Sequence, residues 1–268
     1  MKSKIIALCT SKAFMRASPW IVTCFLIVLW EAFVVIFDVS RIEMPSASES
    51  FAAIYKYRGP LWANSMQTLA ATLMGFGIAV VFGVAMGIAI GLWRPVYAAL
   101  YPLMVAFNSI PKVAVVPIMM LWFGIGMTTA TLTAFILCFF PIVVNMAVAL
   151  ATIEPELKDV LRALGASEKD IIFKIGLPRS LPYLFASLKI AITLAFVGAV
   201  IAETVAGGNG IGNLMLVASS NFNTPLMFAG LIVIAVMATG MYAIFAAMDA
   251  RFTGWATRDN MSYATAGG

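Results

Sequence analysis

Long apolar segments and short polar segments alternate along the chain. An α-helix rises about 1.5 Å per residue, so roughly 20 apolar residues cross the hydrocarbon core of a bilayer. The pattern therefore predicts an all-α, polytopic membrane protein with six transmembrane helices. We expect these helices at Trp20–Phe37, Met66–Leu92, Tyr97–Trp122, Thr128–Ala151, Leu181–Ala206 and Leu226–Met248.

The first apolar segment has an alternative interpretation as a cleaved signal peptide, because basic residues precede it. No small-residue A-x-A cleavage site follows the segment, however, and Glu31 lies inside it. We therefore interpret Trp20–Phe37 as the first span. The polar stretch Asp38–Ser65 after it contains a Gly-Pro breaker and is predicted to be an extramembrane loop.

The second apolar segment carries a ridge of small side chains. Ala79, Gly83, Gly87 and Gly91 recur every four residues and therefore share one face of a helix. Small residues let the backbone of a neighbouring helix approach closely. We therefore expect this face to pack against another span.

The third apolar segment is interrupted by Pro102, Pro111 and Pro117, which lack a backbone N–H. Backbone groups freed in this way must be satisfied by neighbouring helices or by a cavity. Polar side chains in the third and fourth segments are candidates for lining a translocation pathway: Asn108, Ser109, Lys112 and Asn145. For the uncharged three, hydrogen bonding between helices is the alternative role.

Ionisable side chains inside a span are costly in hydrocarbon, so each one is a candidate functional residue. The alternative is that a long side chain reaches the membrane interface. Both interpretations stay open for Lys112, and a lysine that faces a cavity would favour an anionic cargo. Lys189 and Glu203 lie near opposite ends of the fifth span, and we expect them to reach the interfaces.

The segment 154–180, between the fourth and fifth spans, is richer in charge than its surroundings. Pro155 suits a first helical turn and Gly165 suits a left-handed helix end, so one short helix is predicted between them. Apolar residues at helical spacing give it a stripe: Leu157, Val160, Leu161 and Leu164. The stripe favours a surface for a partner protein, and a solvated connection between spans is the alternative.

A second short helix is predicted in the same segment. Ser167 and Asp170 have the spacing of a capping box, in which each residue satisfies a backbone N–H of the other. The helix is expected over Glu168–Gly176, and Pro178 is expected to end it. Both helices would project from the membrane.

The distribution of Lys and Arg predicts the orientation, because cytoplasmic loops carry an excess of these residues. The termini and the loops after even-numbered spans carry most of the 17, whereas the opposite side carries only Arg41, Lys56 and Arg58. Both termini and the segment 154–180 are therefore predicted to be cytoplasmic. Topology thus explains the net charge of +5, and no nucleic-acid partner is expected.

The composition narrows the possible chemistry. The 268 residues include no histidine, which excludes His-ligated zinc sites and imidazole bases. Cys9, Cys24 and Cys138 are too far apart for a CxxC motif. The chain has no GxxxxGK[ST] motif to hold ATP, and the glycine cluster 207–212 is interpreted as a turn. We expect no catalytic, cofactor-binding or metal-binding residues.

The segment 154–180 resembles the EAA loop of ATP-binding-cassette importer permeases, whose pattern is EAA, three residues, G, nine residues, I, one residue, LP. The spacing matches in full at Gly165, Ile175, Leu177 and Pro178, whereas 159–161 reads Asp-Val-Leu in place of EAA. The stretch 110–126 is also similar to this family. The resemblance covers roughly residues 64–248 and is to the branch that serves nitrate, sulfonates, taurine and pyrimidine precursors.

The resemblance implies the permease subunit of an ATP-driven importer for a small, anionic organic or inorganic solute. It implies a homodimer in the bacterial cytoplasmic (inner) membrane, two cytoplasmic ATP-binding subunits and an extracytoplasmic solute-binding protein. The segment 154–180 would be the coupling loop to the ATP-binding subunits. Its candidate contact residues are Asp159, Leu161, Gly165, Ala166, Ile175, Leu177 and Pro178.

Two other functions were considered. A secondary transporter without an ATPase subunit would be expected to show an inverted repeat, and none is evident. An intramembrane enzyme would need a catalytic constellation, which the sequence does not provide. We therefore divide the chain into 1–63 (N-terminal cytoplasmic tail, first span and extracytoplasmic loop), 64–248 (permease core) and 249–268 (cytoplasmic C-terminal tail).

Overall fold

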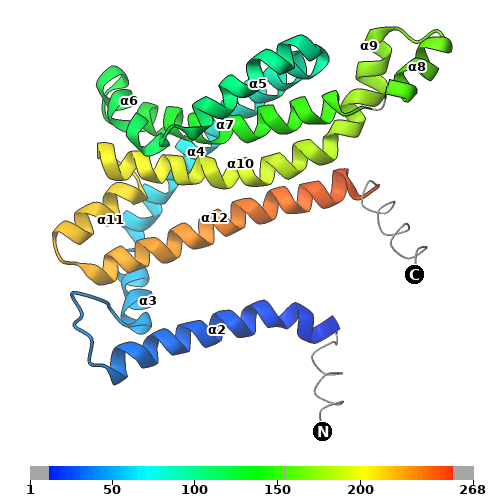
Figure 1. Ribbon diagram of the computed structural model, residues 1–268. Helices are drawn as coiled ribbons and strands as arrows, with labels where there is room; N and C mark the ends of the chain where they lie inside the picture. Colours follow the sequence, from blue (N-terminus) through cyan, green and yellow to red (C-terminus); the bar gives the residue numbers. More distant parts are fainter. Residues whose placement is uncertain (1–11, 154, 256–268) are drawn as a thin grey trace.

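The computed structural model describes residues 12–153 and 155–255, so Cys9, Arg258 and the greater part of both predicted tails lie outside it. The described ranges form helices joined by short loops, as predicted (Figure 1). Five helices among them are long and apolar enough to cross a membrane. They are α2 (Lys12–Ile36), α4 (Arg58–Leu92), α7 (Met127–Ala151), α10 (Leu177–Ala206, extended back to Ile172 by a π-helical turn) and α12 (Thr224–Phe252).

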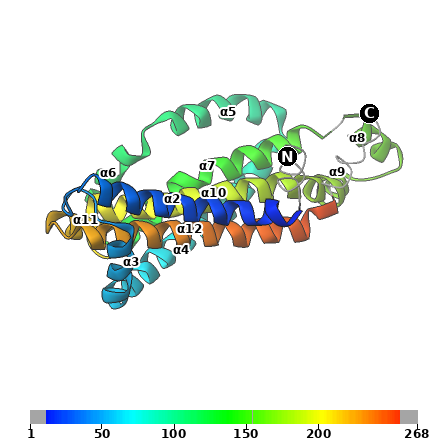
Figure 2. The ribbon, with the colours of Figure 1, turned by 90° about the horizontal axis from the view of Figure 1, so that it is seen from below.

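The remaining helices are shorter. They are α3 (Ala47–Lys56), α5 (Arg94–Ser109), α6 (Val116–Phe123), α8 (Pro155–Ala163), α9 (Glu168–Ile171) and α11 (Ile211–Ser220), with a 3₁₀ turn at Lys112–Val115 and the π turn at Ile172–Gly176. Figures 1 and 2 show α8 and α9 at one end of the bundle and α11 at the other. The start of α2 and the end of α12 lie at the same end as α8 and α9.

Helices α4, α7 and α10 form the centre of the fold, and the predicted glycine ridge of α4 is confirmed as a contact with α7. A Cβ atom at Gly83 would lie 2.8 Å from Ile142 Cγ2, and one at Gly87 would lie 2.6 Å from Met146 Cβ. Gly75, one turn before the predicted ridge, extends this contact, because a Cβ atom there would lie 2.5 Å from Thr131 O. At Gly198 of α10, a Cβ atom would likewise lie 2.9 Å from Ala134 Cα of α7. At these glycine positions, any side chain larger than a hydrogen atom would therefore collide with α7.

The third apolar segment does not form one straight span. The stretch Pro95–Ser109 and the stretch Lys112–Phe123 meet at a bend of 82°. Ile110 is extended at this bend, because the ring of Pro111 disfavours helical geometry in the residue before it. The predicted count of six spans therefore holds only if the bent pair counts as one span.

The stretch Asp38–Ser65 is largely helical, which corrects the prediction of a loop. Helix α3 begins with a capping box between Ser46 and Glu49, and α4 begins at Arg58 rather than at Met66. Glu31 of α2 reaches this corner and accepts hydrogen bonds from the Ser48 backbone N–H at 3.0 Å and from its hydroxyl at 2.8 Å. This polar corner ties α2 to the start of α3.

The second helix of the segment 154–180 does not end at Pro178, which corrects another prediction. The chain stays helical from α9 through the π turn into α10. The Leu177 N–H bonds to Ile172 O across the wider π turn. Pro178 follows in the first turn of α10, where its missing N–H is tolerated. One unbroken helix therefore runs from Glu168 to Ala206.

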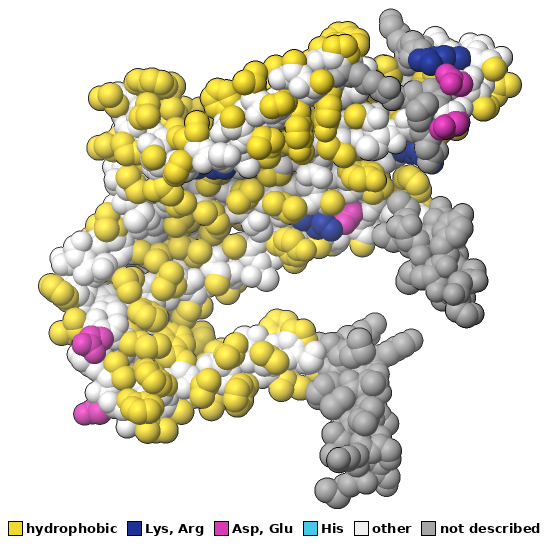
Figure 3. Space-filling view, in the orientation of Figure 1, with side chains coloured by type: hydrophobic (Ala, Val, Ile, Leu, Met, Phe, Trp, Pro, Cys, Tyr) yellow, Lys and Arg dark blue, Asp and Glu magenta, His cyan; other side chains and the backbone are white. Residues whose placement is uncertain are grey.

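Apolar side chains cover the length of the bundle, whereas many of the charged side chains in view lie at its ends (Figure 3). Leu121 is 82% exposed and Phe107 is 73% exposed, although both are large and apolar. Hydrocarbon is the solvent that suits such a surface. The surface therefore agrees with a multi-pass membrane protein.

We predict that Gly75→Ala destabilises the protein by about 1–3 kcal/mol, because the new methyl group meets the backbone of α7 rather than a movable side chain. The matched control is Gly77→Ala on the same helix, where no atom lies within 4 Å of the new Cβ. Thermal unfolding in mild detergent measures both variants. Equal melting temperatures for the two would contradict the close α4–α7 packing.

Candidate functional site

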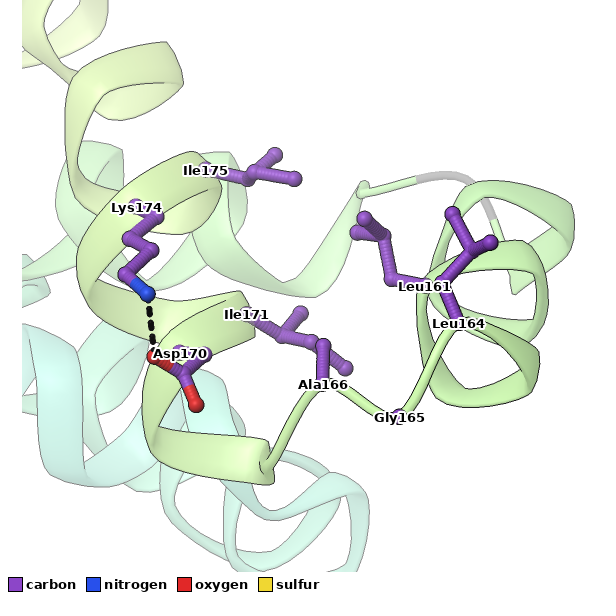
Figure 4. A pocket seen from close by; sticks show the side chains of 8 residues that line it. All are labelled: Leu161, Leu164, Gly165, Ala166, Asp170, Ile171, Lys174 and Ile175. Carbon is purple, nitrogen blue, oxygen red and sulfur yellow. Dashed lines mark ion pairs between the residues drawn. The ribbon is translucent and has the colours of Figure 1, made fainter.

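The segment 154–180 projects from one end of the bundle as two helical arms joined at Gly165 (Figures 1 and 4). Gly165 has φ of +83°, and its N–H bonds to Arg162 O at 2.9 Å. The next N–H, of Ala166, bonds back to Leu161 O at 3.0 Å. These two bonds form the Schellman motif, which closes α8 with a glycine in the left-handed region. The predicted helix end at Gly165 is confirmed.

The start of α9 is fixed by the predicted capping box. The Asp170 N–H donates to Ser167 Oγ at 3.2 Å, and the Ser167 N–H donates to Asp170 Oδ2 at 3.3 Å. Lys174 lies one turn further on, with its Nζ 2.6 Å from Asp170 Oδ1. The Lys174 ammonium and the Ser167 hydrogen bonds lower the pKa of Asp170 to about 2. Because the folded pKa lies below the ordinary value of 3.8, the ionised Asp170 stabilises the folded state at neutral pH. This stabilisation is lost progressively as the pH falls from about 3.8 through about 2.

A pocket of about 300 Å³ lies between the two arms. Figure 4 shows Leu161 and Leu164 on the α8 side and Ile171 and Ile175 on the other side. The Asp170–Lys174 ion pair lies at its edge. The complete lining is Leu161, Leu164, Gly165, Ala166, Asp170, Ile171, Lys174 and Ile175.

The structure brings together four of the seven predicted loop residues, Leu161, Gly165, Ala166 and Ile175. Asp159 instead pairs with Arg162 on the surface of α8, with 3.1 Å between Oδ1 and Nη1. Leu177 and Pro178 lie in the first turn of α10. Four lining residues were not among the seven predicted: Leu164, Asp170, Ile171 and Lys174. The spacing of Ile171 and Ile175 by four residues places these two on one helix face.

The apolar stripe of α8 is only partly covered by the second arm. Leu157 and Leu161 are half-buried, whereas Val160 is 57% exposed and Leu164 is 79% exposed. The charged residues Asp159 and Arg162, which are also exposed, are their neighbours along the chain. Exposed apolar side chains rimmed by charge are typical of a protein interface.

A second candidate site is a cavity of about 620 Å³ beside the bent third segment. Helix α5 arches away from α7 in Figure 2, and the cavity lies between them. Asn108 and Lys112 are among its lining residues, and Lys112 Nζ donates to Asn108 Oδ1 at 2.7 Å. Most of the other lining residues are apolar: Met86, Leu100, Leu103, Met104, Phe107, Ile110, Val115, Ile118, Met119, Trp122, Phe135, Ile136, Phe139 and Phe140.

The other two candidate pathway residues do not line this cavity. The Ser109 hydroxyl donates to Val105 O at 3.0 Å within its own helix. The Asn145 side chain donates to Pro141 O at 2.8 Å, one turn back along α7. Of the four candidates, only Asn108 and Lys112 therefore lie together.

Lys189 and Glu203 each bond to a polar group on another helix. Lys189 Nζ lies 2.5 Å from Asp249 Oδ2 and joins α10 to α12. Glu203 is 3% exposed and accepts hydrogen bonds from Thr68 Oγ1 at 2.8 Å and from the Gly212 N–H at 3.0 Å. Both residues therefore bond to partners that are distant in sequence, and residue spacing alone does not predict such partners.

We predict that Gly165→Val opens the 154–180 segment, because a β-branched residue at φ of +83° costs about 1–3 kcal/mol. No atom lies within 4 Å of a Cβ at this position, so the effect is on the backbone alone. Limited trypsin digestion should cleave after Arg162 roughly tenfold faster. Gly165→Asn is the matched control, since Asn tolerates this region, and equal cleavage of the two variants would refute the cap.

The chain is similar in sequence to known transport proteins over most of its length. Residues 79–254 match the family described as binding-protein-dependent transport system inner membrane component. The riboflavin transport system permease protein of Chloroflexus aurantiacus is 32% identical over 232 residues, which cover 86% of this chain and 87% of the relative. The taurine transport system permease protein of Escherichia coli is 26% identical over 237 residues, which cover 86% of each.

The fold is also similar to that of a solved structure. A chain of the MetNI methionine ABC transporter, in an inward-facing conformation, matches with a TM-score of 0.64 and 21% identity. The match covers 72% of this chain and 96% of that chain. The family match covers well over half of the chain, and the relatives match most of their own length. The chain therefore belongs to the family of binding-protein-dependent transport system inner membrane components, the membrane-spanning permease subunits of ATP-binding-cassette importers, in which ATP hydrolysis takes place on a separate subunit.

Proposed function

We propose that the segment 154–180 is the coupling loop, which docks onto cytoplasmic ATP-binding subunits and transmits their motion to the membrane helices. The observation that carries this proposal is the exposed apolar pair Val160 and Leu164 on α8, held at a fixed angle by the Gly165 cap. A rigid helix with an apolar face suits a groove on a partner protein. The pocket between the two arms offers a second contact for an apolar side chain of that partner.

The proposed orientation places both termini and the coupling loop in the cytoplasm of a bacterium. The start of α2, the end of α12 and the arms α8 and α9 lie at one end of the bundle, which agrees with this arrangement. The excess of Lys and Arg in the loops on that side supports the same orientation. Helix α11 then lies on the extracytoplasmic side, where a solute-binding protein delivers the cargo.

The proposed transporter contains two copies of this chain. Buried side chains and close backbone contacts occupy the space between α4, α7 and α10, so the described residues of one chain leave no open path through this centre. The cavity beside α5 lies away from that centre and supplies a face that a second copy can complete.

We divide the chain functionally into 1–63, the core 64–248 and the tail 249–268.

The proposed cargo is a small anionic solute of the sulfonate, taurine, nitrate or pyrimidine-precursor type. Lys112 and Asn108 supply the positive charge and the amide in the otherwise apolar cavity beside α5. A cation in a low-dielectric cavity attracts an anion more strongly than it would in water. Ser109 and Asn145 remain candidates for contacts in another conformation, in which their local hydrogen bonds are exchanged.

We predict that Leu164→Ser weakens binding of the ATP-binding subunit by roughly tenfold or more, because it removes an apolar anchor from the exposed face. Ala163→Ser, on the neighbouring exposed position of the same helix, is the control and should bind normally. The measurement is co-purification in mild detergent followed by a titration of affinity. Unchanged affinity for Leu164→Ser would argue against this docking face.

We predict that Lys112→Met raises the KM for uptake of the anionic cargo by roughly tenfold in proteoliposomes, because the cavity loses its positive charge. The matched control is Lys56→Met, which removes an exposed lysine outside the cavity. Uptake is assayed first with taurine and nitrate. A KM that is unchanged by Lys112→Met, for a cargo that the wild-type protein transports, would exclude Lys112 from the pathway.

A further inference from the structure

Three consecutive backbone N–H groups at the start of α11 each donate to a side chain from another helix. The pairs are Gly210 N to Asn64 Oδ1 at 2.9 Å, Ile211 N to Thr68 Oγ1 at 2.9 Å, and Gly212 N to Glu203 Oε2 at 3.0 Å. Asn64 and Thr68 lie one turn apart on α4, and Glu203 lies on α10. We call these three acceptors the α11 clamp.

Two of the three acceptors, Thr68 and Glu203, are bonded to each other and buried, whereas Asn64 is half-buried. The Thr68 hydroxyl lies 2.8 Å from Glu203 Oε2, so α4 and α10 are joined to each other as well as to α11. Glu203 is 3% exposed and Thr68 is fully buried. The start of a helix carries a partial positive charge, so the Glu203 carboxylate suits this position. Glu203 is thereby occupied by the protein itself and is unavailable as a cargo ligand.

Two glycines let the carboxylate approach the backbone of α11 this closely. Gly210 has φ of +116°, and a Cβ atom there would collide with the Glu203 carboxyl group. A Cβ atom at Gly212 would lie 2.5 Å from Val200 O. The predicted turn at 207–212 therefore also has a packing role, because its glycines leave room for the Glu203 side chain.

Helix α10 links this clamp to the coupling loop. The helix is continuous from Glu168, in the second arm of the loop, to Ala206, three residues beyond Glu203. At about 1.5 Å per residue, the part from Ile172 to Glu203 spans roughly 48 Å. Figure 1 shows α9 at one end of this helix and α11 at the other. A displacement of the loop therefore reaches α11 through one rigid element and three side chains.

We propose that Asn64, Thr68 and Glu203 are positioning residues for transport, which make α11 move together with α10 and α4. When the ATP-binding subunits displace the coupling loop, the clamp repositions α11 at the opposite end of the permease. The short apolar helix α11 then acts as the moving part of the outer gate. This inference rests on the proposed function, because it needs the coupling loop to be the input.

The test follows the motion at each end of α10 in the complete complex in nanodiscs. A single spin label replaces Phe173 in the loop or Ser219 on α11, both of which are exposed, in a background without the native cysteines. Label-to-label distances between the two permease copies are measured with and without a non-hydrolysable ATP analogue. In the wild-type complex, both distances are expected to change on nucleotide binding.

The decisive variant is Thr68→Val, which keeps the shape of the side chain and removes the hydroxyl that bonds to α11 and Glu203. The matched control is Thr72→Val, one turn along the same helix, where a fully buried hydroxyl has no hydrogen-bond partner among the described residues. Thr68→Val should retain the change at Phe173 and lose at least roughly half of the change at Ser219. Thr72→Val should retain both.

Each other outcome is informative. A full change at Ser219 in Thr68→Val, or an equal loss in Thr72→Val, would overturn the clamp as the link to α11. A role in stability alone would reduce the changes at Phe173 and Ser219 together. No change at Phe173 in the wild-type complex would instead refute the coupling loop of the proposed function. Asn64→Ala, which removes the Gly210 acceptor, is the second variant if Thr68→Val does not assemble.

Discussion

The close approach of α7 to both α4 and α10 is the contact on which the rest of this structure depends. Lipid tails are as apolar as the side chains between the helices, so packing contacts and hydrogen bonds hold the spans together. Gly75 of α4 and Gly198 of α10 both pack against Ala134 of α7 and bring the three backbones close together. A core packed in this way is rigid. We therefore expect the functional contacts at the ends and on the outer faces of the bundle.

The two ends are built on the same long helix. At one end the long helix begins in the segment 154–180, the proposed coupling loop, where Gly165 and the Ser167–Asp170 box set the angle of α8. At the other end Glu203 holds the start of α11. Polar groups thus occur where helices must keep a defined position, and the apolar cavity beside α5 lies where the helices separate. A long helix that joins the two ends, together with a cavity between separated helices, suits a protein that alternates between two packings of its helices.

The features that the sequence predicts correctly are those that depend on neighbouring residues. Apolar length identified the long spans, a period of four identified the α4 ridge, and local spacing identified both caps of the coupling loop. The partners of Lys189 and Glu203 lie on helices that are distant in sequence, so spacing along the chain does not reveal them. The 82° bend beside Pro111 and the continuation of the helix past Pro178 have local causes, but a proline alone does not say whether a helix bends, ends or begins there. The loop pocket was partly predicted, because its α8 side follows from helical spacing and its α9 side depends on the turn at Gly165.

The central claim is that the coupling loop contacts a separate ATP-binding subunit, and site-specific photo-crosslinking in intact cells tests it most directly. A photoreactive amino acid replaces Val160 on α8 or Leu216 on α11, two exposed apolar positions at opposite ends of the bundle. The account predicts that the adduct formed from position 160 contains an ATP-binding subunit and that the adduct from position 216 does not. Capture of this subunit from position 216, or from neither position, would contradict the account.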